Sequence, residues 1–341
     1  MSERLTVFKW AYGTKKQSAY ATPVADVDLT KTHALLGPGD VEEKPEILTD
    51  AEEAGRGTEW AGSQAIERWE ATLKREGYGT PELLGFLCAF WFGSVVTTQP
   101  DAGQAPLVYE HEFRVLRPPT TELPVTSIVE LGASSLRRKI ESAVVSALEI
   151  SAENPGRLKV AADLVGSGKV TLPGSFSFPS MPTESQVYFR TNVMTFTINN
   201  VALTSRLQSF KVRLDNALLL RHGYEPGSGL YRSKIEYGAR RPLTFEYTLF
   251  ADATGGDLAT LRAETLQTPN AIVFDGTDSV NGVLKHKVTI TIPKLKLVGV
   301  RQDDVDGRRV HRITTEIHDD QAAASPINIK VRNANASYLT T

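Results

Sequence analysis

The stretch VVSALEISAENPGRLKVAADLVG, Val144 to Gly166, decides the fold class because apolar and polar residues alternate on both sides of a turn. In residues 158–164 the apolar side chains recur at every second position, so they share one face of a strand. In the preceding run Val144, Leu148 and Ile150 share a face, and ENPGR is typical of a turn. The pattern predicts an antiparallel β-hairpin.

The same alternation recurs along most of the chain from Val108 onward and predicts a mainly β protein with a minor helical part. One helix is expected at residues 81–92, since Thr80 can cap it and Pro81 stands at the first helical position, where proline costs nothing. A second helix is expected at about 256–267. The clearest strands of the second half are VMTFTINNVAL, SFKVRLDNALLL, RPLTFEYTLFA, NAIVFDG, HKVTITIPKLKLVGV and VHRITTEI.

The length of 341 residues makes two domains a reasonable expectation. Residues 168–186 concentrate Gly, Pro and Ser between two strand-rich regions, which places the boundary there. We therefore expect a first β domain at 1–180 and a second at 181–341. Because each has one helix among many strands, the pattern suggests duplication.

Residues 34–59 form the most acidic segment, with eight Asp or Glu against Lys44 and Arg56, two prolines and four glycines. A core strand is not expected there, and the segment is interpreted as a long acidic loop or arm that could order against a neighbouring subunit. Residues 1–170 carry 18 Lys or Arg against 24 Asp or Glu, and residues 171–341 carry 20 against 16. This asymmetry could favour head-to-tail docking of unlike halves, although it can also arise by chance.

Two local features of the second half have alternative interpretations. At Pro293 the apolar phase shifts by one residue, and because proline cannot donate to a ladder, a bulge or an edge position is expected. QDDVDGRR superficially resembles a calcium loop, but with Gly307 at the sixth position Gln302 and Ile313 occupy two ligand positions. A hairpin turn is the favoured interpretation.

No constellation for catalysis, cofactor binding or metal binding is found, so we expect a protein that is not an enzyme. Phosphate-loop, dinucleotide and nucleophile-elbow motifs are absent from the sequence. Cys88 is the only cysteine and is expected in the core, and the six histidines show no metal-ligand spacing: His33, His111, His222, His286, His311 and His318. No basic stripe for specific DNA recognition is present. The N-terminus lacks a signal peptide, and the longest uncharged apolar run is 14 residues, Leu83 to Val96, so a cytoplasmic start without a membrane span is expected.

The order of segments resembles the major tail tube proteins of long, non-contractile bacteriophage tails. The resemblance runs from about Lys15 to Ile317 and depends on the combination of segments, since none is specific alone. The segments that carry it are KKQSAYATPV, GRGTEWAG, TPELLGFLCAFWFG, SALEISAENPGRLKVAADLVGSGK, TFTINNVALTSRLQSFKVRLDN, IEYGARRPLTFEYTLFAD and VTITIPKLKLVGVR.

The resemblance implies two tandem tube domains of β-sandwich or barrel type, each with a flanking helix. It implies stacked rings whose inner sheets join around a DNA channel. Most such subunits have one domain and form hexameric rings, so two domains favour a trimeric, pseudo-hexameric ring, and a homohexamer stays open. Glu149, Glu153 and Asp163 are candidates to face the lumen, but the nearby Arg157 and Lys159 fit a mixed solvated face equally well.

The expected partners are other copies of the chain, the tape-measure protein and genomic DNA in the lumen, and the tail terminator and distal tail proteins at the tube ends. The expected location is the virion tail, after assembly in the host cytoplasm. Two alternatives stay open: the tube of a contractile tail or related injection apparatus, and a carbohydrate-binding β-sandwich module. The second is disfavoured because Trp60, Trp69 and Trp91 lie in or near segments expected to be helical and Trp10 lies near the terminus.

Overall fold

A computed structural model describes most of the chain. The described residues are 9–20, 22–34, 41–49, 64–115, 123–131, 136–180, 188–221, 231, 234–236, 241–251, 256–263, 266–280, 282, 284–320, 323 and 325–341. Strands make up 57% of the structure and helices 9%, which confirms the mainly β class. The strands form large antiparallel sheets, and within the described residues no sheet closes into a barrel.

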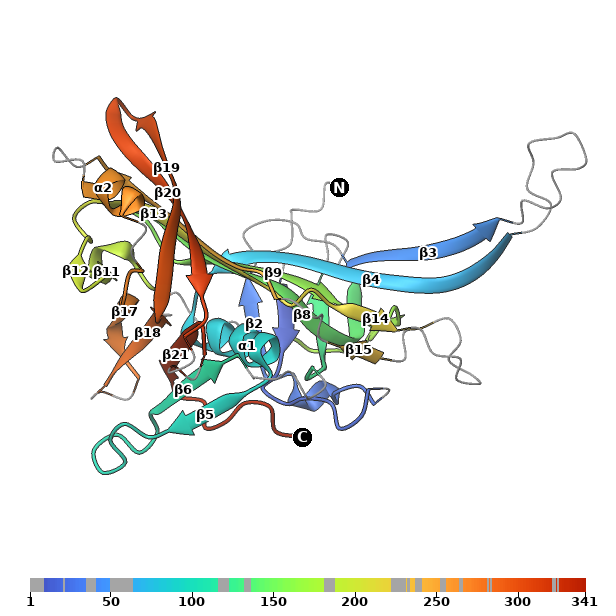
Figure 1. The fold of residues 1–341 in the computed structure, drawn as a ribbon. Coiled ribbons are helices and arrows are strands. Elements are labelled where there is room, and N and C mark those ends of the chain that lie inside the picture. The colour runs from blue at the N-terminus through green and yellow to red at the C-terminus, as the bar shows by residue number, and fades with distance from the viewer. Residues whose placement is uncertain are drawn as a thin grey trace, which may run out of the picture.

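The largest sheet contains a continuous run of eight strands, which we call the long sheet (Figure 1). Each strand of this run is antiparallel to the next, so the first and last strands run in opposite directions. In spatial order the strands are β3 (Val41–Thr49), β4 (Gln64–Tyr78), β9 (Lys159–Val165), β8 (Arg137–Glu153), β13 (Leu207–Asp215), β16 (Leu243–Phe250), β20 (Arg308–His318) and β19 (Lys294–Val305).

A side branch and a second sheet complete the β structure. The first part of β8 also pairs with β7 (Thr126–Leu131) and β10 (Val170–Thr171), and β7 continues into β1 (Lys9–Tyr12) and β2 (Lys31–Ala34). A two-stranded ribbon, β14 (Leu219–Arg221) and β15 (Lys234–Glu236), stands apart. The second sheet has the order β12 (Val201–Ala202), β11 (Met194–Ile198), β17 (Asn270–Ser279), β18 (Lys285–Ile292), β21 (Asn328–Asn333), β6 (Tyr109–Arg114) and β5 (Val95–Thr98).

Helix α1 (Pro81–Phe92) lies at the centre of the core and confirms the predicted helix. The Thr80 hydroxyl accepts a hydrogen bond from the Leu83 amide, and Gly93 ends the helix in the left-handed conformation. All of its residues except Glu82 are buried, and it contacts β8 on one side and β6, β18 and β21 on the other. A helix that is apolar all round therefore fills the space between the two sheets.

Helix α2 (Gly256–Arg262) is shorter than the expected 256–267. The chain leaves the helix before Gln267, whose backbone forms a β-bridge with Leu295. Backbone pairing with β19 therefore replaces the last turn that helix propensity predicts.

The hairpin of β8 and β9 confirms the first prediction, with one correction. Leu158, Val160, Ala162 and Leu164 are all buried, as expected. A β-bulge at Ser146 shifts the phase of β8, so Val145 rather than Val144 shares the core face with Leu148 and Ile150. Val144 is buried in a separate small cluster on the other face.

The segment 34–59 contains a strand, which corrects the expectation of a loop. Val41 to Thr49 form β3, which pairs with the far part of β4, and the two strands project together from the body (Figure 1). Glu42, Glu43 and Lys44 are exposed, so most of β3 lacks the apolar alternation by which strands are recognised. Trp69 lies on β4 rather than near a helix, and Trp60 lies outside the described residues.

The long sheet consists of two copies of one four-stranded unit. In each copy two paired strands are followed by a helix, a hairpin of the second sheet and a hairpin of the long sheet. Strands β3 and β4, helix α1, hairpin β5–β6 and strands β8 and β9 therefore correspond to β13, β16, α2, β17–β18, β19 and β20. Both copies carry a single-residue bulge, at Ser146 in β8 and at Val298 in β19. The bulges align the two units residue by residue. Leu164 of β9 and its partner Leu73 therefore correspond to Thr315 of β20 and its partner Phe245.

The expected division at residue 180 does not coincide with a break between sheets. Pairing of β8 with β13 joins the two units in the long sheet, and β21 joins β6 to β18 in the second sheet. One core cluster contains residues from both halves, including Leu148, Val212 and Ile290. The domain division therefore stays a prediction, while the repeat itself is visible in the strand pairing.

The two local features of the second half are resolved. Asp306 and Gly307, both with positive φ, form the two-residue turn between β19 and β20, which confirms a hairpin rather than a calcium loop. Pro293 lies between β18 and β19, where the chain passes from one sheet to the other and no ladder donor is needed. The bulge lies five residues further on, at Val298, and β19 is an edge strand.

Candidate assembly surfaces

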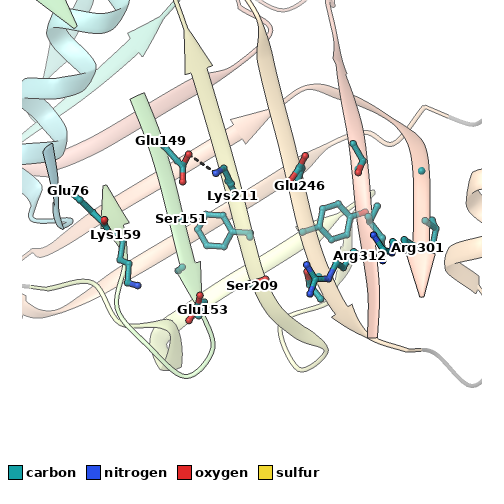
Figure 2. Close-up of a pocket in the computed structure, with 18 residues that line it drawn as sticks. Glu76, Glu149, Ser151, Glu153, Lys159, Ser209, Lys211, Glu246, Arg301 and Arg312 are labelled. Atoms are coloured by element: carbon teal, nitrogen blue, oxygen red, sulfur yellow. Dashed lines mark ion pairs between the residues drawn. The ribbon is translucent and has the colours of Figure 1, made fainter. Parts of the chain in front are cut away.

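One face of the long sheet is apolar and buried, and the other is polar and carries charges of both signs. Alternate residues of β13 illustrate the division: Val212 is buried, whereas Lys211 and Arg213 are exposed. We call the charged side the polar face. It includes a hollow of about 610 Å³ that is lined from β4, β8, β9, β13, β16, β19 and β20 (Figure 2).

Two of the three expected lumen residues meet in this hollow. Glu149 and Glu153 of β8 both line it, together with Lys159 (Figure 2). Asp163 of β9 pairs with Ala147, which lies two residues before Glu149 on β8 and therefore on the same face. Asp163 thus shares the polar face with Glu149, and it is half-buried. The structure thus places all three on one face, although only two line the hollow.

The polar face also carries basic residues that the sequence reasoning missed. The Glu149 carboxylate lies 2.7 Å from the Lys211 Nζ of β13 (Figure 2) and 3.9 Å from the guanidinium of Arg213 on the same strand. Arg312 of β20 pairs with Asp303 at 2.9 Å. The alternation in KVRLD could have indicated that Lys211 and Arg213 face solvent. Only the pairing of β8 with β13, however, brings them close to Glu149.

The long sheet has two outer edges, β3 with β4 on one side and β19 on the other. On the outer side of β19, the only backbone partner found within the described ranges is Gln267, opposite Leu295. On their outer side, residues Leu297 to Val305 have no strand in the described structure, whereas their inner side pairs with β20. Edges of this length normally pair or aggregate, so an exposed edge is a candidate surface for another chain.

A buried ionic cluster holds the base of the β3–β4 projection. Glu130 of β7 is fully buried and forms ion pairs with the buried Arg75 of β4 and, at 3.7 Å, with Arg138 of β8. The Val41 amide donates to the Glu130 carboxylate at 3.1 Å, and Arg138 donates to the Val41 carbonyl at 3.0 Å. These contacts fix where β3 leaves the body.

A second cluster joins α2 to the long sheet. Asp257, in the first turn of α2, forms an ion pair with Arg206 at 2.7 Å, and its carboxylate lies 2.8 Å from Nδ1 of the buried His311. The Arg206 guanidinium also donates to the Phe250 carbonyl. The cluster positions α2 on the second unit, and Arg206 and Asp257 also line a neighbouring hollow of about 220 Å³.

Two buried titratable side chains, His33 and Cys88, are held neutral by their surroundings. Burial lowers the pKa of His33 to about 4 and raises the pKa of the Cys88 thiol, so both are neutral at pH 7.

In the described part of the chain, no three His, Cys, Asp or Glu residues gather in a way that could hold a metal ion. No described helix is long and apolar enough to cross a membrane. Trp10 and Trp91 are buried rather than arranged as a sugar-binding platform.

A repeated antiparallel sheet with one charged face and a long open edge defines a class of mainly β structural subunits that associate through their strands. The family model for the phage tail tube protein matches residues 12–304, and the chain therefore belongs to the phage tail tube family. No curated protein matches the chain. Membership makes the chain a structural component of a phage tail.

Proposed function

We propose that the chain polymerises laterally into rings and that these rings stack into a tube through which the phage DNA leaves. The observation that carries the proposal is the internal repeat. Within one chain, β8 of the first unit pairs with β13 of the second, so the units already join edge to edge. When the same contact joins each unit to the next, each step rotates the unit by a fixed angle, and the units form a ring if these rotations add up to one full turn.

The repeat also supports three chains per ring. Eight strands of the long sheet in each of three chains supply 24 strands, arranged as six units. At a strand spacing of about 4.8 Å and a tilt of about 40°, 24 strands enclose a barrel roughly 50 Å wide between backbones. Six chains would double this width to roughly 100 Å. The narrower barrel, reduced by its inward side chains, suits a DNA channel better than the wider one.

We place the polar face, with Glu149, Glu153 and Asp163, toward the channel. A lining that attracted many phosphates would retain DNA, because each neutralised phosphate adds salt-dependent affinity. Glu149 engages Lys211 and Arg213, two exposed basic residues that would otherwise bind phosphate. The carboxylates thus act by neutralising neighbouring cations, which favours passage without adhesion.

The further partners follow from the same role. The tape-measure protein would occupy the channel before DNA does, and terminator and distal tail proteins would meet the exposed rings at the tube ends. Assembly would take place in the host cytoplasm. The β3–β4 projection extends beyond the body and would contact a neighbouring subunit or ring (Figure 1).

Native mass spectrometry and negative-stain microscopy of the purified chain test this proposal. We expect tubes, or rings of about 112 kDa, which is three times the chain mass of 37.3 kDa. A chain that stays monomeric at every concentration would contradict polymerisation. Rings of six chains would contradict the proposed three chains per ring but would leave the proposed polymerisation intact.

A further inference from the structure

We propose that Glu130 and Arg138 form an autoinhibitory clasp on Val41, the first residue of β3, which closes this edge of the long sheet in the isolated chain and has to open before rings form. This inference rests on the proposed ring and adds how its assembly is restrained.

The clasp occupies both outward backbone groups of Val41. The amide donates to the Glu130 carboxylate at 3.1 Å, and the carbonyl accepts from the Arg138 guanidinium at 3.0 Å. The amide and carbonyl of one residue in a β-strand point to the same side, and those of the next residue point to the other side. Since Val41 bonds to these side chains, its backbone groups point away from β4.

The next outward positions on β3 offer little to an approaching strand. Glu43 and Pro45 follow Val41 at alternate positions, so their backbone groups also point away from β4. Pro45 has no amide donor. A strand that approached this stretch would find only the amide and carbonyl of Glu43 and the carbonyl of Pro45. Proline and blocking side chains are the means by which proteins close sheet edges.

The repeat identifies the residue of the second unit that is equivalent to Val41. Val41 pairs with Leu73, and Val212 pairs with Phe245, which is the counterpart of Leu73. Both valines are buried in the same core cluster, so they also face the same side of the sheet. Val212 therefore shows what these backbone groups do where no clasp is present.

In the second unit the equivalent groups take part in strand pairing. The Asn216 amide, just after β13, donates to the Ser146 carbonyl of β8. By alternation the backbone groups of Val212 also point toward β8, where Val212 pairs with Ile150. The clasp on β3 thus occupies the groups that join one unit to the next inside the chain.

The clasp is an addition to the repeated unit. Glu130 and Arg138 lie directly opposite each other across β7 and the first part of β8. Strand β7 lies between β6 and β8 in the chain, whereas no strand separates β18 from β19 in the second unit. The clasp therefore stands only at the outer edge of the first unit, where no further unit of the same chain follows.

The clasp can open without leaving a buried charge uncompensated. When Val41 leaves, the Glu130 carboxylate keeps its ion pairs with Arg75 and, at 3.7 Å, with Arg138. An unpaired buried charge would make opening costly, and none is created here. The isolated chain favours the closed form, and a neighbour that supplies new bonds to Val41 shifts the population to the open form.

Arg138→Met tests the clasp, because it removes the donor to the Val41 carbonyl and keeps the Glu130–Arg75 pair. The variant should form rings or tubes at about tenfold lower concentration than the wild type, since loss of one hydrogen bond to a charged group shifts an equilibrium by about this factor. Arg137→Met, which removes the neighbouring cation and its bond to the Gly174 carbonyl, is the matched control and should leave this concentration unchanged.

Hydrogen exchange of the unassembled chain provides a second readout. The amides of residues 41–46 should exchange about tenfold faster in Arg138→Met than in the wild type or in Arg137→Met. Circular dichroism checks folding, and Arg138→Lys, a milder change with fewer donors, should shift both readouts in the same direction if the Met variant does not fold.

The outcomes separate the clasp from the proposed function. Tubes from the wild type and Arg138→Met at equal concentrations, unchanged exchange, or shapeless aggregate in place of tubes overturns the clasp and leaves the proposed function intact. Tubes from Arg138→Met at concentrations where the wild type stays monomeric support the clasp. If neither protein forms rings or tubes at any concentration, the proposed function fails and the clasp fails with it.

Discussion

The Glu130 cluster provides a quantitative test of how the β3–β4 projection is anchored. Glu130→Gln keeps the size of the side chain but leaves the buried Arg75 without its full counter-charge and weakens the contact with Arg138. Breaking a buried ion pair by removing one partner costs about 3–5 kcal/mol. The Val41 amide keeps an oxygen acceptor in the variant, so most of the loss comes from the uncompensated arginine.

The expected loss converts to a measurable melting shift. The entropy of unfolding is about 2.1 cal/mol/K per residue, or about 0.7 kcal/mol/K for this chain, so the loss lowers Tm by roughly 4–7 °C. Differential scanning calorimetry of the unassembled chain measures it. Glu246→Gln, at an exposed position of β16, is the control and should shift Tm by less than about 1 °C. A Glu130→Gln variant as stable as this control would refute the cluster's anchoring role.

Three further predictions concern the fold. Val160→Asp places a charge in the core and should prevent folding, whereas Lys159→Glu should fold normally by circular dichroism but alter assembly or DNA passage; unfolding of both would contradict the assignment of faces. Burial lowers the pKa of His33 to about 4 in the folded chain, below its ordinary 6.5, so its contribution to the free energy of unfolding is present above pH 6.5 and falls by about 2 kcal/mol at pH 5. Denaturant titration at the two pH values should show a smaller fall for His33→Gln than for the wild type. An equal fall in both proteins would show that His33 is not its source. Gly168→Ala should cost roughly 1–3 kcal/mol because φ is +99° and a Cβ would meet a backbone carbonyl at 2.2 Å, while Gly174→Ala should be neutral; equal melting curves would disprove the strain.

The sequence predicts those elements whose local signal agrees with their final environment. Helix α1 has its cap at Thr80, proline at the first position and an unbroken apolar run, and each of these local features persists in the buried helix. The β8–β9 hairpin is predicted by alternation because one face is buried and the other solvated.

The strands of the β3–β4 projection could not be predicted because they are stabilised by pairing rather than by burial. Glu42 and Lys44 are exposed along β3, so no apolar period marks the strand. In β4 the run ERWEATLKRE favours helix by composition, yet pairing with β3 and β9 keeps it extended. Likewise, Ser146 carries no local sign of the bulge that moves Val144 away from the core face.

The polar face was only partly predictable for a related reason. Glu149, Glu153 and Asp163 lie on the hairpin that alternation reveals, so they could be named as candidates. Lys211 and Arg213 reach the same surface only through the β8–β13 pairing, which joins residues more than 60 positions apart. The sequence suggested a duplication from the one helix among many strands in each half, but it could not align the two units, since their paired strands share strand positions and bulges rather than residue identities.

Cryo-electron microscopy of an assembled tube tests the central claim most directly, because it reveals both the number of chains per ring and the orientation of the long sheet. The account predicts three chains per ring, 24 strands around the channel, and the side chains of Glu149 and Lys211 facing inward. A ring in which the polar face points outward, or a ring with a number of chains other than three, would contradict it.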